Sequence, residues 1–481
     1  ATLTFNGWNT PLVAAEVAIN ATVTHLAQGA TAPDPATGEW VADNRVWIVC
    51  SNLSVAAGAQ INVDGAGFAG GSSRNGSGPG AGVQTTYQAT GGGHGGYGNH
   101  GCSAMFGPVY GSHVAPLWPG SGAAGNISYG AGTGGAGGGA ILIEATGRIT
   151  LDGGLSANGA NYVKVRAGGG SGGSIYLKCR TIQGATGTLR AQGGNGSSTG
   201  AADFSGGGGG GRISVDYEPA AQHALPRPSL AFSVAPGGSI GEQGKGIHGT
   251  VWFPDSSLLQ ETFAIDGIVY GFTNWNCGNL TVTNGLARFA EPGFNLAVDG
   301  DLCVAGPSVR LDLGGNTNML RYWSTSLWYF DRSDMPSPPE LQVGGNLVLT
   351  NGGCLRLYCG YTNSADAAFG GRIRIGKACN IHSNSALHLA SHPTNGASAL
   401  VSAHRVIVAA GGAISADAMG FRGRWLNLAD TTAMFGPGAG QSAQYWGNGA
   451  GHGGIGSRSA NNSSLAPTYG CSNAPVLPGS A

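Results

Sequence analysis

The chain has 481 residues, of which 91 are glycine and only 10% are charged. Its 23 basic and 24 acidic residues give a net charge of −1, so no basic excess favours nucleic acid or an anionic membrane surface. The sequence also lacks the long apolar run of a membrane-spanning helix, the strict every-third glycine of collagen and the high charge of a disordered chain.

Residues 1–45 differ from the rest of the chain because they contain few glycines and several β-branched residues. This composition predicts two or three short strands and a turn near residues 33–35. A terminal segment of distinct composition beside a repeat array is typical of a cap, or of strands that dock on a neighbouring chain. We expect residues 1–45 to serve one of these two roles.

Residues 46–255 form the first part of a long repeat, in which glycine runs separate strands of alternating apolar and polar residues. The apolar positions recur in order: Ile141, Ile175 and Ile213; Ile143, Leu177 and Val215; Leu155 and Leu189. Alternation with period two indicates strands with one buried face. Recurrence after a few tens of residues is typical of a solenoid in which each turn stacks on the last. We therefore predict an all-β parallel β-helix, or β-solenoid.

The glycine runs, such as GGGHGGYGNHG at residues 91–101, have no side chains to bury, yet their backbone groups need hydrogen-bond partners. Two arrangements are open. The runs could be long loops lying against the solenoid. They could instead be bundled extended helices with three residues per turn, which would form polyglycine II-like layers.

Residues 256–400 resume as a leaner β-solenoid, in which a few Gly, Asn or Asp residues separate most strands. A long aromatic loop, residues 316–339, interrupts it. Flat rings beside hydrogen-bonding groups suit a sugar face or a protein partner, and packing of the rings over the solenoid is the structural alternative. The candidate carbohydrate- or partner-binding residues of this loop are Arg321, Tyr322, Trp323, Trp328, Tyr329 and Arg332.

Residues 401–481 resemble the opening part of a second copy of the repeat. GAISADAMGF at 412–421 matches AQINVDGAGF at 59–68. The GHGG motif of His94 recurs at His452, 358 residues later. We expect such a partial copy to leave its last coil open. Either the protein continues, or a neighbouring molecule covers the coil head to tail, which builds open filaments.

The sequence shows no catalytic or metal-binding constellation, so we expect no catalytic residue, no metal and no cofactor. His94 and His452 are equivalent, but the nearby His100 and His113 are absent from the second copy, and we expect these histidines to hydrogen-bond glycine carbonyls. Five aspartates could serve a β-helix polysaccharide lyase, although turn positions give Asp a structural reason to be there. They are Asp64, Asp152, Asp299, Asp301 and Asp312.

Two features bear on the compartment of the protein. Nine cysteines occur without a CxxC pair, which leaves the disulfide pairing open. Eight N-x-S/T sequons would permit glycosylation of a secreted chain. They are Asn20, Asn52, Asn75, Asn126, Asn195, Asn279, Asn461 and Asn462.

The motif series GGGHGG, YG, AP, PGSG, GGAI, GGSI and GGGGGGRI runs from residue 91 to residue 213. It resembles the repeat of very large secreted, glycine-rich β-helical surface proteins of environmental bacteria. The resemblance covers about residues 45–217 and 400–481, and it implies an extracellular, adhesive or matrix role. Glycine-rich phage fibre-tip adhesins are a looser likeness.

These observations predict a structural subunit of an extracellular filament or surface layer, with copies of the same chain as its head-to-tail partners. The protein would be secreted and lie at the cell surface. The alternatives are a carbohydrate-binding adhesin and a β-helix polysaccharide lyase, both with extracellular polysaccharide as the partner. We expect neither a nucleic-acid partner nor a membrane span.

Overall fold

The computed structural model describes residues 2–84, 89–99, 107–127, 132–164, 166–197, 205–239, 244–315, 320–321, 328–329, 337–362, 369–421, 436–440, 442–443, 446–447, 449–457, 465–472 and 477–480. The chain divides into two compact units. Unit 1 comprises residues 1–260 and 264–272, and unit 2 comprises residues 261–263 and 273–481.

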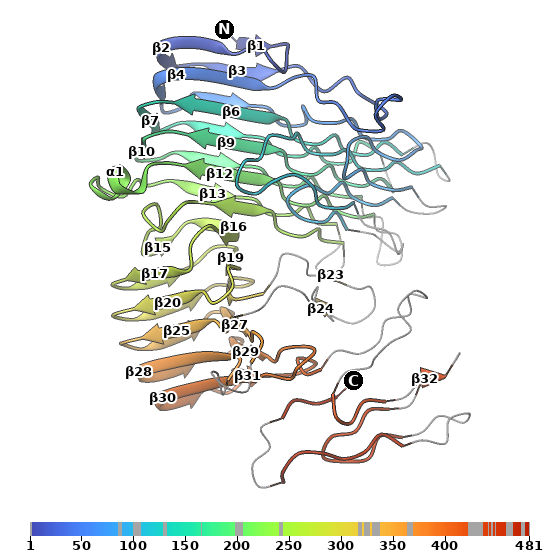
Figure 1. Cartoon of the computed structure of the whole chain (residues 1–481), viewed down its shortest axis with the longest axis vertical. Helices are drawn as coiled ribbons and strands as arrows, with labels where there is room; N and C mark the ends of the chain where they lie inside the picture. Colours follow the sequence, from blue (N-terminus) through green and yellow to red (C-terminus); the bar gives the residue numbers. More distant parts are fainter. Residues whose placement is uncertain are drawn as a thin grey trace. The chain divides into compact units, whose positions relative to one another are not determined.

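Unit 1 consists of short parallel strands stacked coil upon coil (Figure 1). Its elements are β1 (Thr2–Phe5), β2 (Leu12–Ile19), β3 (Thr22–His25), β4 (Val46–Val55), β5 (Gln60–Asn62), β6 (Ala140–Ala145), β7 (Arg148–Leu151), β8 (Gly154–Ser156), β9 (Ser174–Lys178), β10 (Thr181–Gln183), β11 (Thr188–Arg190), β12 (Arg212–Asp216), α1 (Pro219–His223), β13 (Ala231–Ser233), β14 (Thr250–Trp252) and β16 (Ile265–Tyr270).

The register of unit 1 matches the recurrence seen in the sequence. One ladder runs through β2, β4, β6, β9, β12, β14 and β16, and a second through β1, β3, β5, β8, β11, β13 and β16. Ile175 pairs with both Ile141 and Ile213, and Leu155 pairs with Leu189. The prediction of an all-β fold with stacked parallel strands is confirmed.

The core of unit 1 lies inside these coils. Alternate side chains of each strand point inward, so Ile48 stacks on Ile143 and Ile143 stacks on Leu177 in the next coil. All three side chains are fully buried. Burial of one such side chain stabilises the fold by roughly 1.5–3 kcal/mol relative to its exposure to water.

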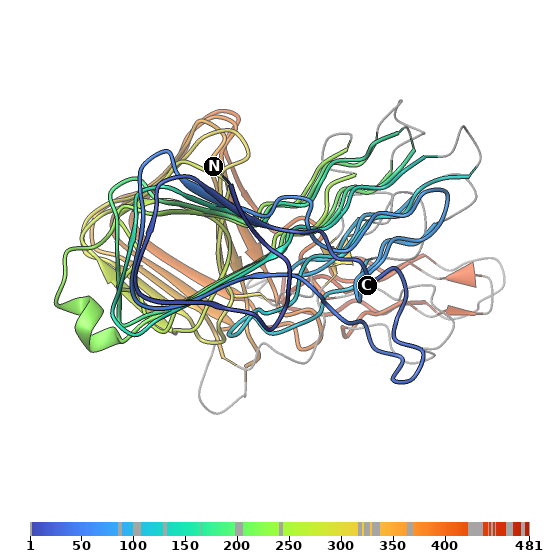
Figure 2. The same ribbon diagram turned by 90° about the horizontal axis from the view of Figure 1, so that it is seen from above.

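The glycine-rich segments of unit 1 run side by side away from the strand coils (Figure 2, blue to green). In residues 168–173, successive N–H groups donate in turn to three neighbouring segments, 121–124, 206–209 and 157–160, and the order of partners repeats after three residues. At Gly208, a Cβ atom would overlap the carbonyl oxygen of Gly170. Glycine is therefore required there because the two backbones approach too closely for a side chain.

Unit 2 is a second stack of parallel strands with two small antiparallel pairs. Its elements are β15 (Thr262–Phe263), β17 (Asn274–Cys277), β18 (Leu280–Val282), β19 (Leu286–Phe289), β20 (Asn295–Val298), β21 (Leu302–Ala305), β22 (Arg310–Leu313), β23 (Leu320–Arg321), β24 (Trp328–Tyr329), β25 (Glu340–Val343), β26 (Leu347–Thr350), β27 (Cys354–Tyr358), β28 (Gly371–Ile381), β29 (Ala386–Ala390), β30 (Ala399–Val408), β31 (Ala413–Ser415), β32 (Ser442–Ala443) and β33 (Trp446–Gly447).

Three parallel ladders build the coils of unit 2. They run through β17, β20, β25, β28 and β30, through β15, β18, β21, β26 and β28, and through β19, β22, β27, β29 and β31. Leu296, Leu341 and Ile373 stack inward with no exposed surface. One corner takes the left-handed backbone conformation at Asn351 (φ 53°) and Gly352 (φ 88°), which these two residue types tolerate best.

Each unit has strands whose inward-facing apolar side chains are open to solvent. In unit 1, Leu3 and Leu12 pair with the buried Val23 and Ile48, yet they are 49% and 38% exposed. In unit 2, Ile414 pairs with the buried Leu387 and is 46% exposed. The apolar interior of each stack therefore reaches solvent, at β1–β2 in unit 1 and at β30–β31 in unit 2.

Two further properties concern the described residues. Their eight cysteines, Cys50, Cys179, Cys277, Cys303, Cys354, Cys359, Cys379 and Cys471, are free thiols. No helix in this part of the chain is both long and apolar enough to cross a membrane.

Candidate functional site

The aromatic loop at residues 316–339 is described only in part. Its strands β23 and β24 pair antiparallel, with Arg321 opposite Trp328 and Leu320 opposite Tyr329. Three predicted binding residues lie outside the described residues: Tyr322, Trp323 and Arg332. Binding by this loop therefore stays a prediction.

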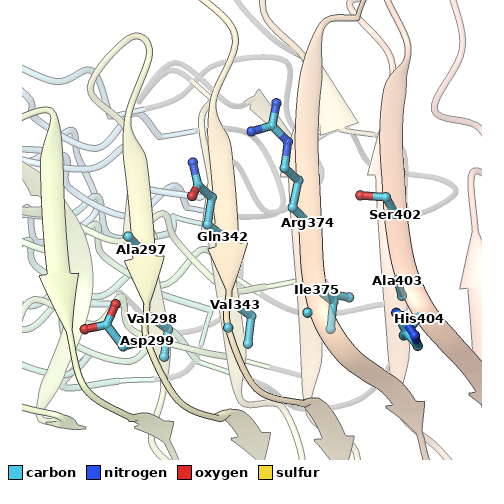
Figure 3. A pocket seen from close by; sticks show the side chains of 12 residues that line it. Ala297, Val298, Asp299, Gln342, Val343, Arg374, Ile375, Ser402, Ala403 and His404 are labelled. Atoms are coloured by element: carbon cyan, nitrogen blue, oxygen red, sulfur yellow. The ribbon is translucent and has the colours of Figure 1, made fainter.

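A groove of 490 Å³ lies on the outer face of unit 2, across β20, β25, β28 and β30 (Figure 3). Gln342, Arg374 and Ser402 point from three successive strands to the same side, because Gln342 pairs with Arg374 and Arg374 pairs with Ser402. Parallel strands lie about 4.8 Å apart, so this row presents one polar side chain per coil.

Two glycines lie along the floor of the groove. Asp299 and His404 line its two ends, and Gly344 and Gly376 hold the corresponding positions on the two strands between them. Asp299 and His404 are both exposed. A Cβ atom on Gly344 would overlap the carbonyl oxygen of Asp299, and one on Gly376 would overlap that of Gly344, so glycine lets the backbones of successive coils approach closely here.

The groove is lined by side chains of both charge types: Arg374 and His404 on β28 and β30, and Asp299 after β20. β28 and β30 contain no Asp or Glu, whereas together they contain Arg372, Arg374, Lys377, His404 and Arg405. Arg374 Nη1 lies 3.1 Å from Glu340 Oε1 of β25, with the two side chains 50% and 27% exposed. Because half of the Arg374 side chain is exposed, the ion pair contributes little to stability, on the order of 1 kcal/mol or less.

Three of the candidate aspartates have the structural role expected at turns. Asp64, Asp152 and Asp301 each accept a hydrogen bond from a backbone N–H of the next coil, at 2.7, 2.8 and 2.6 Å. These contacts tie successive coils together at their corners. Within the described residues, no group of three or more His, Cys, Asp or Glu side chains is placed to hold a metal ion.

Asp312 corrects the expectation of a turn position, because it lies in β22 and has no exposed surface. Its carboxylate contacts Arg288 Nη2 at 2.5 Å and Arg310 Nε at 2.9 Å. Burial alone would raise the pKa of Asp312, but the charges of Arg310, Arg288 and Arg356 together lower it below its usual value. The sequence RLDL did not show this burial, because the outer face of a solenoid strand is ordinarily solvated.

His94 hydrogen-bonds a glycine carbonyl, as expected from the sequence. Its ring is fully buried, and Nδ1 donates to Gly172 O at 2.9 Å. Burial, aided by the charge of Arg212, lowers the pKa of His94 to about 3. The imidazole is therefore neutral at physiological pH, as a side chain inside a network of backbone amides must be.

The second copy of the repeat reproduces the local structure of the first. The rings of His94 and Tyr110 lie 4.6 Å apart, and those of His452 and Tyr469 lie 4.7 Å apart. Ser121 Oγ donates to the Tyr110 hydroxyl at 2.9 Å, and Ser480 Oγ donates to the Tyr469 hydroxyl at the same distance. The two copies thus share contacts as well as sequence.

The predicted glycosylation sites differ in accessibility. Asn126 is buried and Asn20 is exposed between β2 and β3. Four others accept a backbone N–H with their side-chain oxygen: Asn52, Asn75, Asn195 and Asn279. Asn461 and Asn462 lie outside the described residues. We expect Asn20 to be the most accessible of the six described sites.

Comparison with known protein families, curated proteins and solved structures found no match for this chain. The resemblance to secreted surface proteins therefore stays a prediction. Three features of the molecule bear on its function: its open apolar strand edges, its glycine network and the groove of unit 2.

Proposed function

We propose that this protein is a structural subunit of an extracellular filament or surface layer, in which copies of the chain add head to tail. The observation that carries the proposal is the exposure of inward-facing apolar side chains on β1–β2 and on β30–β31. Exposure to water of apolar side chains whose equivalents are buried in other coils is unfavourable by about 25 cal/mol per Å² of apolar surface. A further coil stacked on either edge would remove that cost.

The internal repeat indicates which kind of partner suits the edge of unit 2. Ile414 of β31 is the equivalent of Ile61 of β5, 353 residues earlier. Ile61 is fully buried because β5 pairs in parallel with β3 on one side and with β8 on the other. The edge at β30–β31 thus belongs to a strand type that accepts another parallel coil. A coil from a second copy of the chain would supply one.

The edges of the two units match in type and in length. β2 has eight residues and β30 has ten, so they could form a continuous parallel ladder between molecules. The two edges come from different parts of the chain, so the interface is heterologous and its repetition gives an open assembly. The net charge of −1 offers little electrostatic repulsion between copies.

We also propose that the glycine-rich segments of unit 1 form polyglycine II-like layers that stiffen each subunit. Partners that repeat every three residues, as in residues 168–173, fit an extended helix with three residues per turn. Backbones packed without side chains satisfy their hydrogen bonds with their neighbours. Such a bundle would resist bending more than the surface loops of an ordinary solenoid.

The test is the association state of the full chain. We expect sedimentation velocity and negative-stain microscopy to show species that lengthen as protein concentration rises. The variant Leu3→Glu/Leu12→Glu places charges on the open edge of unit 1 and should shift the protein to monomers. The control Val163→Glu changes a side chain that is 69% exposed outside these edges, and it should assemble like the wild type. A chain that stays monomeric at every soluble concentration would refute the proposal.

A further inference from the structure

We infer that the glycine-rich face of the second repeat copy, residues 449–457, binds an extended glycine run of another polypeptide in which an arginine follows the glycines. The first copy has the equivalent face at residues 91–99, and there the structure shows what covers it. The residues of the second face belong to neither β30 nor β31, so the inference does not depend on assembly through the strand edges.

In the first copy, the face at residues 91–99 is covered by the glycine run 206–211. The N–H of Gly209 donates to Gly92 O at 2.9 Å. The N–H of Gly96 donates to Gly210 O at the same distance. A Cβ atom on Gly209 would overlap the carbonyl oxygen of Gly96, so the covering run has to be glycine.

The arginine that follows this run is a second element of recognition. Arg212 is only 6% exposed, and its Nε and Nη2 donate to Tyr110 O at 3.0 and 2.8 Å. Hydrogen bonds from a charged donor are stronger than those between neutral groups. The second copy offers the same acceptor, because the N–H of Tyr469 donates to His452 O at 2.9 Å just as that of Tyr110 donates to His94 O at 3.1 Å.

The second copy keeps this face, and the part of the chain that the structure describes leaves its glycines open. Gly453 and Gly454, the equivalents of Gly95 and Gly96, are both exposed. A Cβ atom on either of them would meet no atom within 4 Å, whereas one on Gly95 would overlap Gly211 O.

The conformation of the chain does not require glycine at this place either, because the φ angles of Gly453 and Gly454 lie outside the left-handed region. What does require glycine is the close approach of another backbone, as at Gly95. The first copy therefore indicates both the place and the chemistry of the ligand: a glycine run whose carbonyls reach the positions of Gly210 O and Gly211 O.

A second folded copy of the chain does not offer its own run 206–211 for this purpose. All six N–H groups of that run already donate to backbone carbonyls of the same chain. The partner has to bring a glycine run that is not yet bonded to neighbours of its own. We therefore assign the face to a separate glycine-rich polypeptide.

The test is fluorescence anisotropy of a labelled peptide with the sequence of residues 205–217, SGGGGGGRISVDY, titrated with the full chain. The protein carries Leu3→Glu/Leu12→Glu, so that binding is measured separately from assembly. We expect saturable binding that Gly453→Leu weakens about tenfold or more, because the new side chain would fill the place of a peptide carbonyl. The change Arg212→Gln in the peptide should weaken binding to a similar extent, since charge-assisted hydrogen bonds are lost.

Gly238→Leu is the matched control, because a Cβ atom there meets only Asn195 Oδ1, at 3.9 Å, and this variant should bind like its parent. Thermal unfolding should give the same midpoint for Gly453→Leu and its parent, which separates lost binding from lost folding. Absence of peptide binding, or binding that Gly453→Leu leaves unchanged, would overturn the inference. If Gly453→Leu in the wild-type chain instead abolished growth with protein concentration, the face would belong to a second copy of the chain and the inference would be wrong.

Discussion

At the scale of single residues, the polar side chains buried in this protein are held in fixed charge states by their surroundings. His94 is neutral because it has no contact with water and lies near the charge of Arg212. Asp312 is ionised because three arginines offset the cost of its burial. Each side chain therefore ties folding to one protonation state, and such a link can be measured as a dependence of stability on pH.

His94 should make the protein less stable in mild acid. The pKa of His94 is about 3 in the folded protein and about 6.5 in an unfolded chain, so below pH 6.5 only the unfolded chain takes up the proton. The contribution is constant above pH 6.5 and falls by at most about 1.4 kcal/mol per pH unit down to pH 3. We expect His94→Asn to remove this dependence. The difference in unfolding free energy between wild type and variant should then shrink by about 2 kcal/mol between pH 6.5 and pH 4.5.

Urea unfolding at several pH values would measure this effect. His223→Asn, at an exposed position in α1, is the matched control and should follow the wild type. Parallel pH profiles for the wild type and His94→Asn would contradict the prediction.

At the scale of elements, two kinds of backbone pairing hold unit 1 together. In the first kind, parallel strands such as β4, β6 and β9 hydrogen-bond to one another within a sheet and bury their inward-facing side chains inside the coils. The glycine-rich segments donate in three directions and bury only backbone. The first kind tolerates exchange among apolar residues of similar volume, whereas the second depends on glycine.

Gly208→Ala should destabilise the protein markedly although it adds one methyl group. The new Cβ would overlap the carbonyl oxygen of Gly170, and backbone cannot move aside as a flexible side chain can. We expect a loss of about 1–3 kcal/mol, seen as a lower midpoint in thermal unfolding followed by circular dichroism. Gly453→Ala is the control, because a Cβ there meets no atom within 4 Å. Equal midpoints for the two variants would show that the segments have room to spare.

At the scale of the whole molecule, the proposed assembly needs two different edges that meet each other. Leu3 and Leu12 lie at one edge, and Val406 and Val408 of β30 lie at the other, with 48% and 44% of their surface exposed. In an interface between unlike edges, a variant blocked at one edge can still bind through its other edge. An interface between like edges does not have this property.

Mixing two edge variants should restore a single interface. Leu3→Glu/Leu12→Glu blocks one edge and Val406→Glu/Val408→Glu blocks the other, so we expect each variant alone to stay monomeric. Mixed together, the intact edges should join into a dimer that cannot grow, visible as one new species in sedimentation velocity. If either variant dimerised alone, the interface would join like edges and the head-to-tail arrangement would be wrong.

The sequence by itself determined that the chain is a stack of parallel strands, and it even identified the register partners Ile141, Ile175 and Ile213. The reason is local: an apolar residue at a fixed place in every coil must stack on its equivalent to leave water. It also predicted that His94 hydrogen-bonds a glycine carbonyl and that Asp64, Asp152 and Asp301 occupy corners, because these residue types beside glycine mark turns. The partners themselves lie on other coils and are not given by the sequence.

Only the tertiary structure decided what gathers on the outer faces of the coils. The groove combines residues from Asp299 to His404 on four strands, and the segments between those strands vary in length, so no fixed spacing marks the site. The burial of Asp312 beside Arg288 of the neighbouring coil was likewise invisible in RLDL. Outward positions are not constrained by the repeating core, so the chemistry that they share depends on how the coils stack.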